Sequence, residues 1–191
     1  GSLSFGGAYG TNGGFSLIAG FSESNFLGRG QRLELNFSGA EENQTYEIRF
    51  TEPALLGRDL ALDFELGYRE TNNSFADYDT TIARFSPGLT FPVSEAGRLR
   101  TYYKAESVEI SSYPFVGTLL EAEANQGQLW SSSLGYTYSY DNRRGGLDPD
   151  TGFLLQFGQE FAGLGGDSTY IKTTAKAQAQ TTILNDEITL R

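Results

Sequence analysis

The residues whose types could do chemistry gather most densely between positions 139 and 153, in the stretch SYDNRRGGLDPDTGF. Its second half begins like a calcium-binding loop, but Gln159 stands where such a loop would place a bidentate glutamate. Two arginines beside glycines could hold a phosphate, yet Asp141, Asp148 and Asp150 nearby would repel it. We therefore expect a solvated turn with local ion pairs, and no metal site.

A second set of candidates consists of carboxylates that alternate with apolar residues, because paired carboxylates can perform general acid–base catalysis. The carboxylates are Asp63, Glu65 and Glu47, and the arginines expected to balance them are Arg49, Arg69 and Arg84. The chain contains no histidine and no cysteine, which excludes Ser–His–Asp triads, thiolate nucleophiles and metal sites built from those residues. We expect ion pairs on a polar face, so neither an enzyme nor a cofactor is predicted.

Length and composition narrow the remaining classes of protein. With 191 residues and 38% hydrophobic content, the chain can form one substantial domain. A formal net charge of -10 argues against a nucleic acid as partner, because binding to its backbone requires a basic surface. No apolar run approaches the roughly 18 residues of a spanning helix, so no such helix is predicted.

The elements that must position these side chains show a two-residue alternation, which marks β-strands because successive side chains point to opposite faces. In RDLALDFELGYRE, residues 58–70, one face carries Leu60, Leu62, Phe64, Leu66 and Tyr68, and the other carries Asp63, Glu65, Gly67 and Arg69. The same pattern recurs and predicts about ten strands and no helix. The expected ranges are 2–9, 14–22, 31–39, 44–51, 58–70, 77–91, 98–110, 128–141, 152–161 and 167–181, with an eleventh strand beginning at Glu187.

Two architectures can accommodate such an up-and-down meander. A soluble barrel or sandwich would turn the apolar face onto a core, whereas a membrane barrel turns that face toward lipid and lines its lumen with the polar face. The strands reach the roughly 9–11 residues that span a bilayer, and aromatic residues, 14% of the chain, gather on the apolar face and near strand ends. These features favour an all-β, antiparallel transmembrane β-barrel. Trp130, the only tryptophan, is expected to be an interfacial anchor.

Three motifs stand in one order along the chain: FSESNFLGRGQ (21–31), FTEPALLGRDLAL (50–62) and SYDNRRGGLDPDTGFLLQFGQEFAGLGGD (139–167). Together they resemble the barrel of the BamA family, the outer-membrane protein assembly factors of Gram-negative bacteria. The opening GSLSFGGAYGTNGGF (1–15) is similar to the first barrel strand and first loop of that family. The resemblance extends over essentially the whole chain.

The resemblance implies a sixteen-stranded barrel that inserts other barrel proteins into the bacterial outer membrane and is preceded by periplasmic POTRA domains. Residues 1–191 are therefore expected to be the N-terminal portion of such a barrel, with the POTRA domains and C-terminal strands absent. The family's Arg-Gly-Phe motif of the sixth extracellular loop falls beyond Arg191. The implied partners are the lipid bilayer, unfolded outer-membrane protein clients and, through the POTRA domains, assembly-complex lipoproteins.

Other functions are compatible with the same alternation. A related translocation barrel, TamA-like or of the two-partner secretion type, shares this architecture. A passive porin-type channel would need a constriction of charged side chains from loops folded inward. A soluble binding barrel of the lipocalin type would differ by staying in solution without detergent.

The working part of an insertase barrel is expected to be a strand edge, and the first strand, SLSFGGAYG at residues 2–10, is the candidate. Glycines in or beside a strand weaken its ladder, so this strand should open easily as a lateral gate and pair with a client strand. The expected pairing residues are Leu3, Ser4, Phe5, Gly6, Gly7, Ala8 and Tyr9, with Leu3, Phe5 and Tyr9 facing lipid or client. The alternative is that the glycines relieve crowding in a tightly curved barrel.

Overall fold

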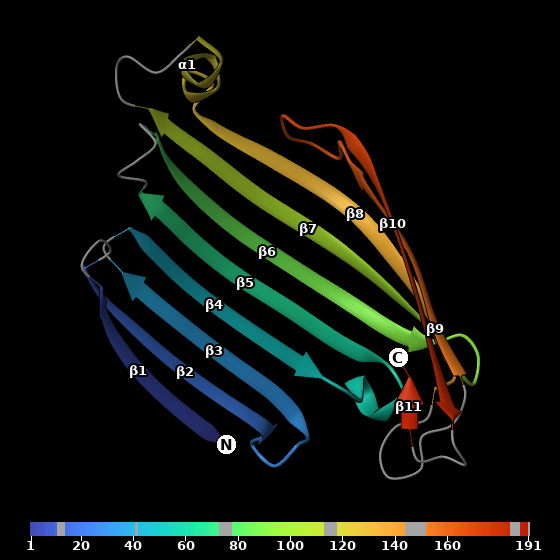
Figure 1. Ribbon diagram of the computed structural model, residues 1–191. Helices are drawn as coiled ribbons and strands as arrows, with labels where there is room; N and C mark the ends of the chain where they lie inside the picture. The colour runs from blue at the N-terminus through green and yellow to red at the C-terminus, as the bar shows by residue number, and fades with distance from the viewer. Residues whose placement is uncertain are drawn as a thin grey trace.

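The structure, a computed structural model, describes residues 1–10, 14–40, 42–72, 78–112, 118–143, 152–183 and 188–190. These residues form an eleven-stranded sheet in which each strand lies beside the next one along the chain (Figure 1). All the neighbouring strands are antiparallel. The predicted all-β, up-and-down meander is therefore confirmed.

The strand bounds agree with the predicted ranges to within a few residues. The strands are β1 (Ser2–Gly10), β2 (Gly14–Phe26), β3 (Gln31–Ala40), β4 (Asn43–Glu52), β5 (Ala61–Asn72), β6 (Tyr78–Pro92), β7 (Gly97–Ser112), β8 (Gln128–Asp141), β9 (Gly152–Ala162), β10 (Tyr170–Ile183) and β11 (Ile188–Leu190). β5 starts at Ala61 and not at the predicted residue 58, because a 3-10 turn, η1 (Leu55–Gly57), precedes it. The turn is closed by the Leu55 N–H, which donates to the Leu60 carbonyl oxygen at 2.8 Å.

The prediction that the chain has no helix was wrong between β7 and β8, where α1 (Thr118–Ala124) forms. Its sequence, TLLEAEA, is composed mainly of leucine, glutamate and alanine, which favour helix. Because this connection lies outside the sheet, local propensity decides its conformation there. Neither α1 nor η1, the helical segments among the described residues, is long and apolar enough to cross a membrane.

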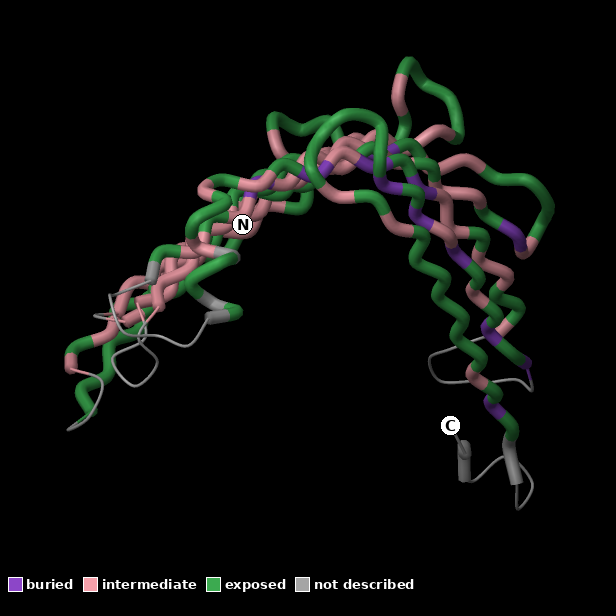
Figure 2. The backbone as a smooth tube through the Cα atoms, turned by 90° about the horizontal axis from the view of Figure 1, so that it is seen from above, coloured by how far each residue is buried: buried purple, intermediate pink, exposed green. Residues whose placement is uncertain are grey.

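The sheet bends into an open arch whose two edges are β1 and β11 (Figure 2). Neighbouring strands of a sheet are rotated relative to one another by their right-handed twist, and this rotation accumulates into curvature. The arch has a concave inner wall and a convex outer wall. Alternate residues of every strand face one wall or the other.

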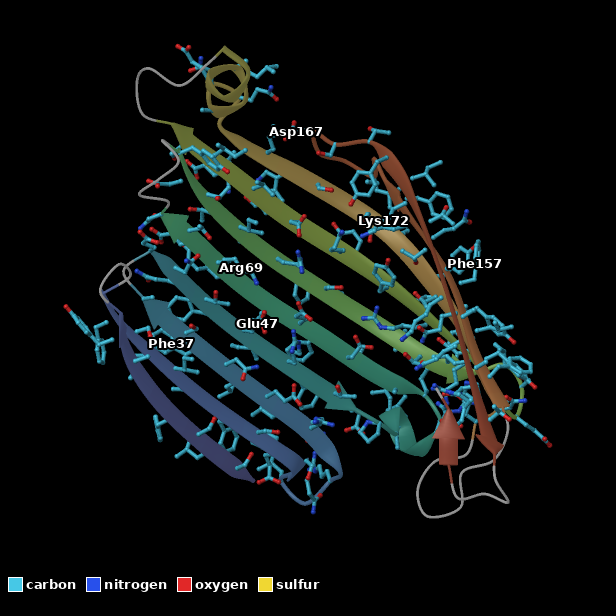
Figure 3. The ribbon with its side chains drawn as sticks, viewed as in Figure 1. Phe37, Glu47, Arg69, Phe157, Asp167 and Lys172 are labelled. Atoms are coloured by element: carbon cyan, nitrogen blue, oxygen red, sulfur yellow. The ribbon has the colours of Figure 1, made fainter. Side chains whose placement is uncertain are left out.

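The apolar wall faces outward. Along β9, Leu154 and Glu160 on the inner wall are buried, whereas Phe153 and Phe157 on the outer wall are 42% and 43% exposed. Figure 3 shows Phe157 and Lys172 on opposite sides of the limb formed by β9 and β10. A soluble barrel would bury the phenylalanines and expose the carboxylate, so the arrangement is that of a membrane barrel.

β6 carries a proline within the sheet, and a neighbouring hydroxyl compensates for it. Proline has no backbone N–H to donate, and the β6–β7 register skips Ser86 and Pro87. The Ser86 hydroxyl donates instead to the Tyr103 carbonyl oxygen on β7, at 3.1 Å. The carbonyl thus keeps a donor at the position where the ladder lacks one.

The polarity of the two walls predicts the effect of charge on the outer one. Phe64→Arg should lower the free energy of unfolding by about 2–4 kcal/mol, because Phe64 stacks on Phe50 at 5.2 Å on the outer wall and a charge near the bilayer midplane is unfavourable. Glu65→Ala, on the inner wall, should cost about 0–1 kcal/mol because its ion pairs are partly exposed. Urea unfolding of protein folded into lipid vesicles measures both; equal losses would contradict a lipid-facing outer wall.

The Ser86 hydroxyl should contribute measurably to the β6–β7 ladder. Ser86→Ala should lower the free energy of unfolding by about 1 kcal/mol, because the Tyr103 carbonyl loses its donor. Ser86→Thr, which keeps a hydroxyl, is the matched control and should retain most of the stability. If the two variants unfold at the same urea concentration in vesicles, the hydroxyl does not replace the missing ladder bond.

Candidate functional site

The predicted site residues all lie on β1, which is an edge of the described sheet. β1 pairs with β2 from Ser2↔Ser22 to Gly10↔Gly14, and its opposite side has no neighbour among the described strands. All nine residues of β1 are exposed. The outer wall receives Leu3, Phe5, Gly7 and Tyr9, and the inner wall receives Ser4, Gly6 and Ala8. The structure therefore places the predicted residues together on one strand.

The glycines of β1 are not required by close contacts within the described chain. A Cβ added at Gly6 would meet no atom within 4 Å, and one at Gly7 would make ordinary contact at 3.7 Å with Phe15. At Gly20, on β2, an added Cβ would lie 2.8 Å from the Ser4 hydroxyl oxygen. Within the described chain, Gly20 is crowded by Ser4, whereas no described residue crowds Gly6, which leaves this position of the strand without a side chain to pack.

The inner wall beside β1 is lined with small and polar side chains. A pocket of about 220 Å³ lies over β1 to β3. Its inner-wall lining consists of Ser2, Ser4, Gly20, Ser22, Glu34 and Asn36. Such side chains fill little space between the strands, so β1 is held to the sheet mainly by its backbone pairing with β2.

Further along the sheet, charges of alternating sign form a ladder across four neighbouring strands of the inner wall. Arg49 on β4 contacts Glu47 at 3.2 Å and Glu65 on β5 at 3.2 Å. Arg84 on β6 lies 3.9 Å from Glu65 and 2.7 Å from Glu106 on β7. Both arginine side chains are 45% exposed, so each pair contributes little to stability on its own.

The predicted balance of charges is confirmed in part. Arg49 and Arg84 hold Glu47 and Glu65 as expected, but Asp63 pairs with Arg100 of β7, a partner that the sequence had not indicated. Arg69 and Glu47, both labelled in Figure 3, line a pocket of about 90 Å³ together with Gly67. The carboxylates considered for acid–base catalysis are therefore held in ion pairs.

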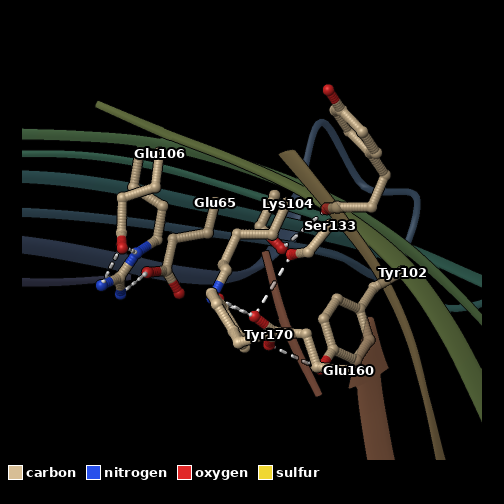
Figure 4. Close-up of polar contacts among 10 residues, drawn as sticks. Glu65, Tyr102, Lys104, Glu106, Ser133, Glu160 and Tyr170 are labelled. Atoms are coloured by element: carbon tan, nitrogen blue, oxygen red, sulfur yellow. Dashed lines mark hydrogen bonds and ion pairs between the residues drawn. The ribbon is translucent and has the colours of Figure 1, made fainter. Parts of the chain in front are cut away.

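A second polar cluster joins β7, β8, β9 and β10 around the buried carboxylate of Glu160 (Figure 4). Lys104 lies 2.5 Å from this carboxylate, and the Tyr170 hydroxyl donates to it at 2.5 Å. Tyr102 and Ser133 donate to it at 3.0 and 3.2 Å. The lysine and glutamate side chains are only 18% and 9% exposed, so this pair is screened far less than the ladder.

The glycines of the inner wall make room for this cluster. An added Cβ at Gly135 on β8 would overlap the ring of Tyr102, and one at Gly88 on β6 would lie 2.7 Å from an Arg100 nitrogen. The Arg100 guanidinium in turn lies over the Tyr102 ring, 4.9 Å from its centroid. Small residues on β6 and β8 thereby allow long side chains of β7 to lie flat along the wall.

The predicted turn within residues 139–153 is described only at its two ends. Arg143, beyond the end of β8, donates from Nε to Asp141 at 2.9 Å, and this carboxylate raises the pKa of Arg143 by accepting its hydrogen bonds. The Phe153 N–H donates to the Asn142 side-chain oxygen at 2.8 Å. One of the predicted local ion pairs is thus present, and residues 144–151, with the aspartates considered for calcium, lie outside the described part.

Some residues that form the polar contacts of the inner wall were not predicted from the sequence. Arg100, Tyr102, Lys104 and Glu106 alternate along β7, and this alternation could have placed them on one face. Their partners could not be found in this way, because Lys104 reaches across β8 to Glu160. Among the described residues, no three acidic side chains approach one another closely enough to hold a metal ion.

An antiparallel up-and-down sheet with an apolar outer wall and a polar, ion-paired inner wall defines the chain as part of a membrane β-barrel. The match to a family model identifies the superfamily of this barrel. The Omp85 superfamily domain matches residues 25–191, and the chain belongs to this superfamily.

Individual relatives agree with this assignment. The chain is 22% identical over 179 residues to the outer membrane protein assembly factor BamA of Neorickettsia risticii, covering 93% of this chain and 24% of that protein. It is 24% identical over 178 residues to the sorting and assembly machinery component 50 homolog B of Xenopus laevis, covering 91% of this chain and 37% of that protein. The chain thus spans well under half the length of these relatives.

A solved structure has the same fold. The crystal structure of BamA from Haemophilus ducreyi lacking POTRA domains 1–3 matches 96% of this chain and 38% of its own, with a TM-score of 0.69 and 22% sequence identity. The resemblance to the BamA family that the sequence motifs indicated is confirmed.

The Glu160 cluster should contribute far more stability than the exposed ladder. Glu160→Ala should lower the free energy of unfolding by about 3–5 kcal/mol, because it leaves the largely buried Lys104 without its anion. Adding Lys104→Ala to the same chain should recover part of the loss, since the unpaired charge is then absent. Urea unfolding in vesicles measures both variants; a double variant that is less stable than Glu160→Ala would show that the charge pair is not the source of the effect.

Proposed function

We propose that this chain is the N-terminal part of a barrel that folds and inserts β-barrel proteins into an outer membrane, with β1 as the lateral gate. The observation that carries the proposal is the exposure and the pairing of β1. It is a nine-residue strand, exposed throughout and paired with β2 alone in the described sheet. The names of the relatives, an assembly factor and a sorting and assembly component, support assembly as the activity.

The chemistry of an edge strand suits this function. A backbone N–H or C=O without a partner in lipid costs several kcal/mol, so β1 must pair with another strand in the closed barrel, and we expect the last strand to be that partner. Gly6 and Gly7 leave this contact poor in side-chain packing. A client strand that presents its own unpaired backbone can then replace the last strand through the same hydrogen bonds, as in strand addition to other sheet edges.

The side chains of β1 differ between the two faces of the strand. Leu3, Phe5 and Tyr9 project from the outer wall, where they would meet lipid when the gate is shut and a client side chain when it is open. Ser4, Gly6 and Ala8 face the interior and carry no large side chain that would obstruct an incoming strand. The pairing is therefore expected to depend on the backbone of residues 3–9 more than on any one side chain.

The remaining parts of the proposal concern the whole protein. We propose that residues 1–191 form the N-terminal portion of the barrel domain, that POTRA domains precede it and further strands follow it, and that assembly lipoproteins bind through the POTRA domains. The lipid bilayer and unfolded outer-membrane proteins are the other expected partners. The motifs shared with the BamA family support a bacterial outer membrane as its location.

A disulfide across the closed gate tests this function. In the full-length protein, Ser4→Cys or Ala8→Cys would be combined with a cysteine at the facing position of the last strand. The oxidised barrel should stall in inserting client barrels, and a reductant should restore the rate, because clients can reach the β1 edge only when the seam opens. The measurement is the rate of client insertion into vesicles that contain the protein.

The matched control joins β1 to its other neighbour. Ala8 and Ser16 face each other across β1 and β2, so a disulfide between cysteines at these positions adds the same bond without closing the gate. It should leave client insertion unchanged. If the barrel locked to its last strand inserts clients as fast as its reduced form, β1 is not the gate.

A further inference from the structure

An aromatic row crosses the outer wall near the rim that carries α1, and it is interrupted over two strands. Phe37, Tyr46 and Tyr68, on β3 to β5, lie side by side with ring centroids 5.1 and 6.1 Å apart. The row continues in register through Ala83 on β6 and Ser107 on β7, and resumes at Trp130 on β8. Two small residues thus stand where neighbouring strands carry rings.

The interruption forms a groove of about 530 Å³ on the outer wall. Leu66 and Tyr68 line it on β5, Trp130 lines it on β8, and Ala83, Phe85 and Ala105 line it between them. Three strand spacings separate β5 from β8, or about 14 Å between backbones. The groove is therefore a hollow over the methyl groups of Ala83 and Ala105, which lies between two bulky walls and is bounded by the Phe85 ring.

The groove offers no charge to a ligand. Arg84 is the one residue with a full charge in its lining, and the guanidinium of that residue pairs with Glu106 on the inner wall at 2.7 Å. Tyrosine hydroxyls mark one end of it: Tyr68 donates to Glu70 at 3.3 Å, toward the rim. The groove thus has a polar end toward the rim and an apolar end at Phe85, which is the polarity of a lipid in one leaflet of a bilayer.

The wall formed by Trp130 is held in place by the connection between β9 and β10. The Trp130 N–H donates to an Asp167 carboxylate oxygen at 2.8 Å, and the Asp167 N–H donates to the Trp130 carbonyl oxygen at 2.7 Å. Asp167 follows the last residue of β9, so these two hydrogen bonds extend the pairing of β8 with this segment of the chain. These hydrogen bonds fix the backbone that carries the Trp130 side chain, which lowers the entropic cost of binding a ligand beside it.

We infer that this groove is a binding site for one acyl chain of a bilayer lipid, with the polar end of that lipid at the α1 rim. The outer wall faces lipid, so the groove is continuous with the membrane. An acyl chain is the apolar, unbranched and abundant partner that such a groove accepts. This inference depends on the barrel being in a membrane and not on the action of β1 as a gate.

Trp130 is a built-in reporter of this site, because it is the only tryptophan of the 191 residues. The full-length protein, with any tryptophan outside these residues replaced by phenylalanine, would be folded in detergent micelles. A phosphatidylcholine with brominated acyl chains is then titrated, and bromine quenches the fluorescence of a tryptophan in contact with it. Quenching should saturate at about one lipid per protein, as expected for a single formed site.

Filling the groove should remove this binding. Ala105→Phe places a ring on the floor of the groove and should raise the half-saturating lipid concentration about tenfold or more. Ala83→Phe is a second variant of the same kind, in case one of them does not fold. The matched control is Ala177→Phe, on the outer wall of β10 and outside the groove, which should leave the titration unchanged.

The outcomes separate the possible occupants. An unchanged half-saturation in both groove variants would show that Trp130 meets only exchanging boundary lipid, and would overturn the inference. Failure of brominated lipid to quench the wild-type protein would show that a protein surface or a second copy of the chain covers the groove, and would overturn it too. Client insertion by the same samples is measured separately, so loss of the lipid site and loss of the proposed assembly function can be distinguished.

Discussion

In hydrocarbon, a backbone N–H or C=O without a partner costs several kcal/mol, and this constraint governs the whole sheet. Strands β2 to β9 have a neighbour on each side, whereas β10 pairs with β11 only from Thr181 to Ile183. Even the donor that Pro87 lacks is replaced by the Ser86 hydroxyl. Within the described sheet, β1 and most of β10 lack a neighbouring strand on one side, so the demand for partner strands is concentrated at these two edges. An edge of this kind is a reactive site made of backbone rather than of side chains.

The inner wall distributes stability unevenly along the sheet. In the limb of β7 to β10, a buried carboxylate is held by a lysine, two tyrosines and a serine. Around β4 to β7 the ion pairs are half exposed and individually weak. Near β1 the wall consists of serines, glycines, an asparagine and a glutamate. Cross-strand bonding therefore weakens toward the edge that is proposed to open, which lets β1 move without loosening the rest of the barrel.

The outer wall is uneven in shape as well as apolar. Its aromatic residues do not form a uniform belt, because Ala83 and Ser107 interrupt the row between Tyr68 and Trp130. In a soluble protein such a gap would be filled by a packed core, since voids forfeit dispersion contacts. In a membrane, neighbouring lipid fills such a gap, so the shape of the wall determines how that lipid packs against it. Substitutions of small outward-facing residues can thus act on the lipid shell and not only on the barrel.

The sequence by itself determined the strands and their two-faced polarity, because a two-residue alternation is local and every strand of Leu, Phe and Tyr facing Arg, Glu and Ser displays it. Its motifs also indicated the family. It did not reveal α1, where local helix propensity acts in a connection outside the sheet. Only the tertiary structure decided which charges meet: register and curvature bring Tyr102 to Glu160 and Arg100 to Asp63, and no alternation along one strand encodes a partner on another. The gap between Tyr68 and Trp130 has the same origin, because a groove exists only when strands distant in sequence lie side by side.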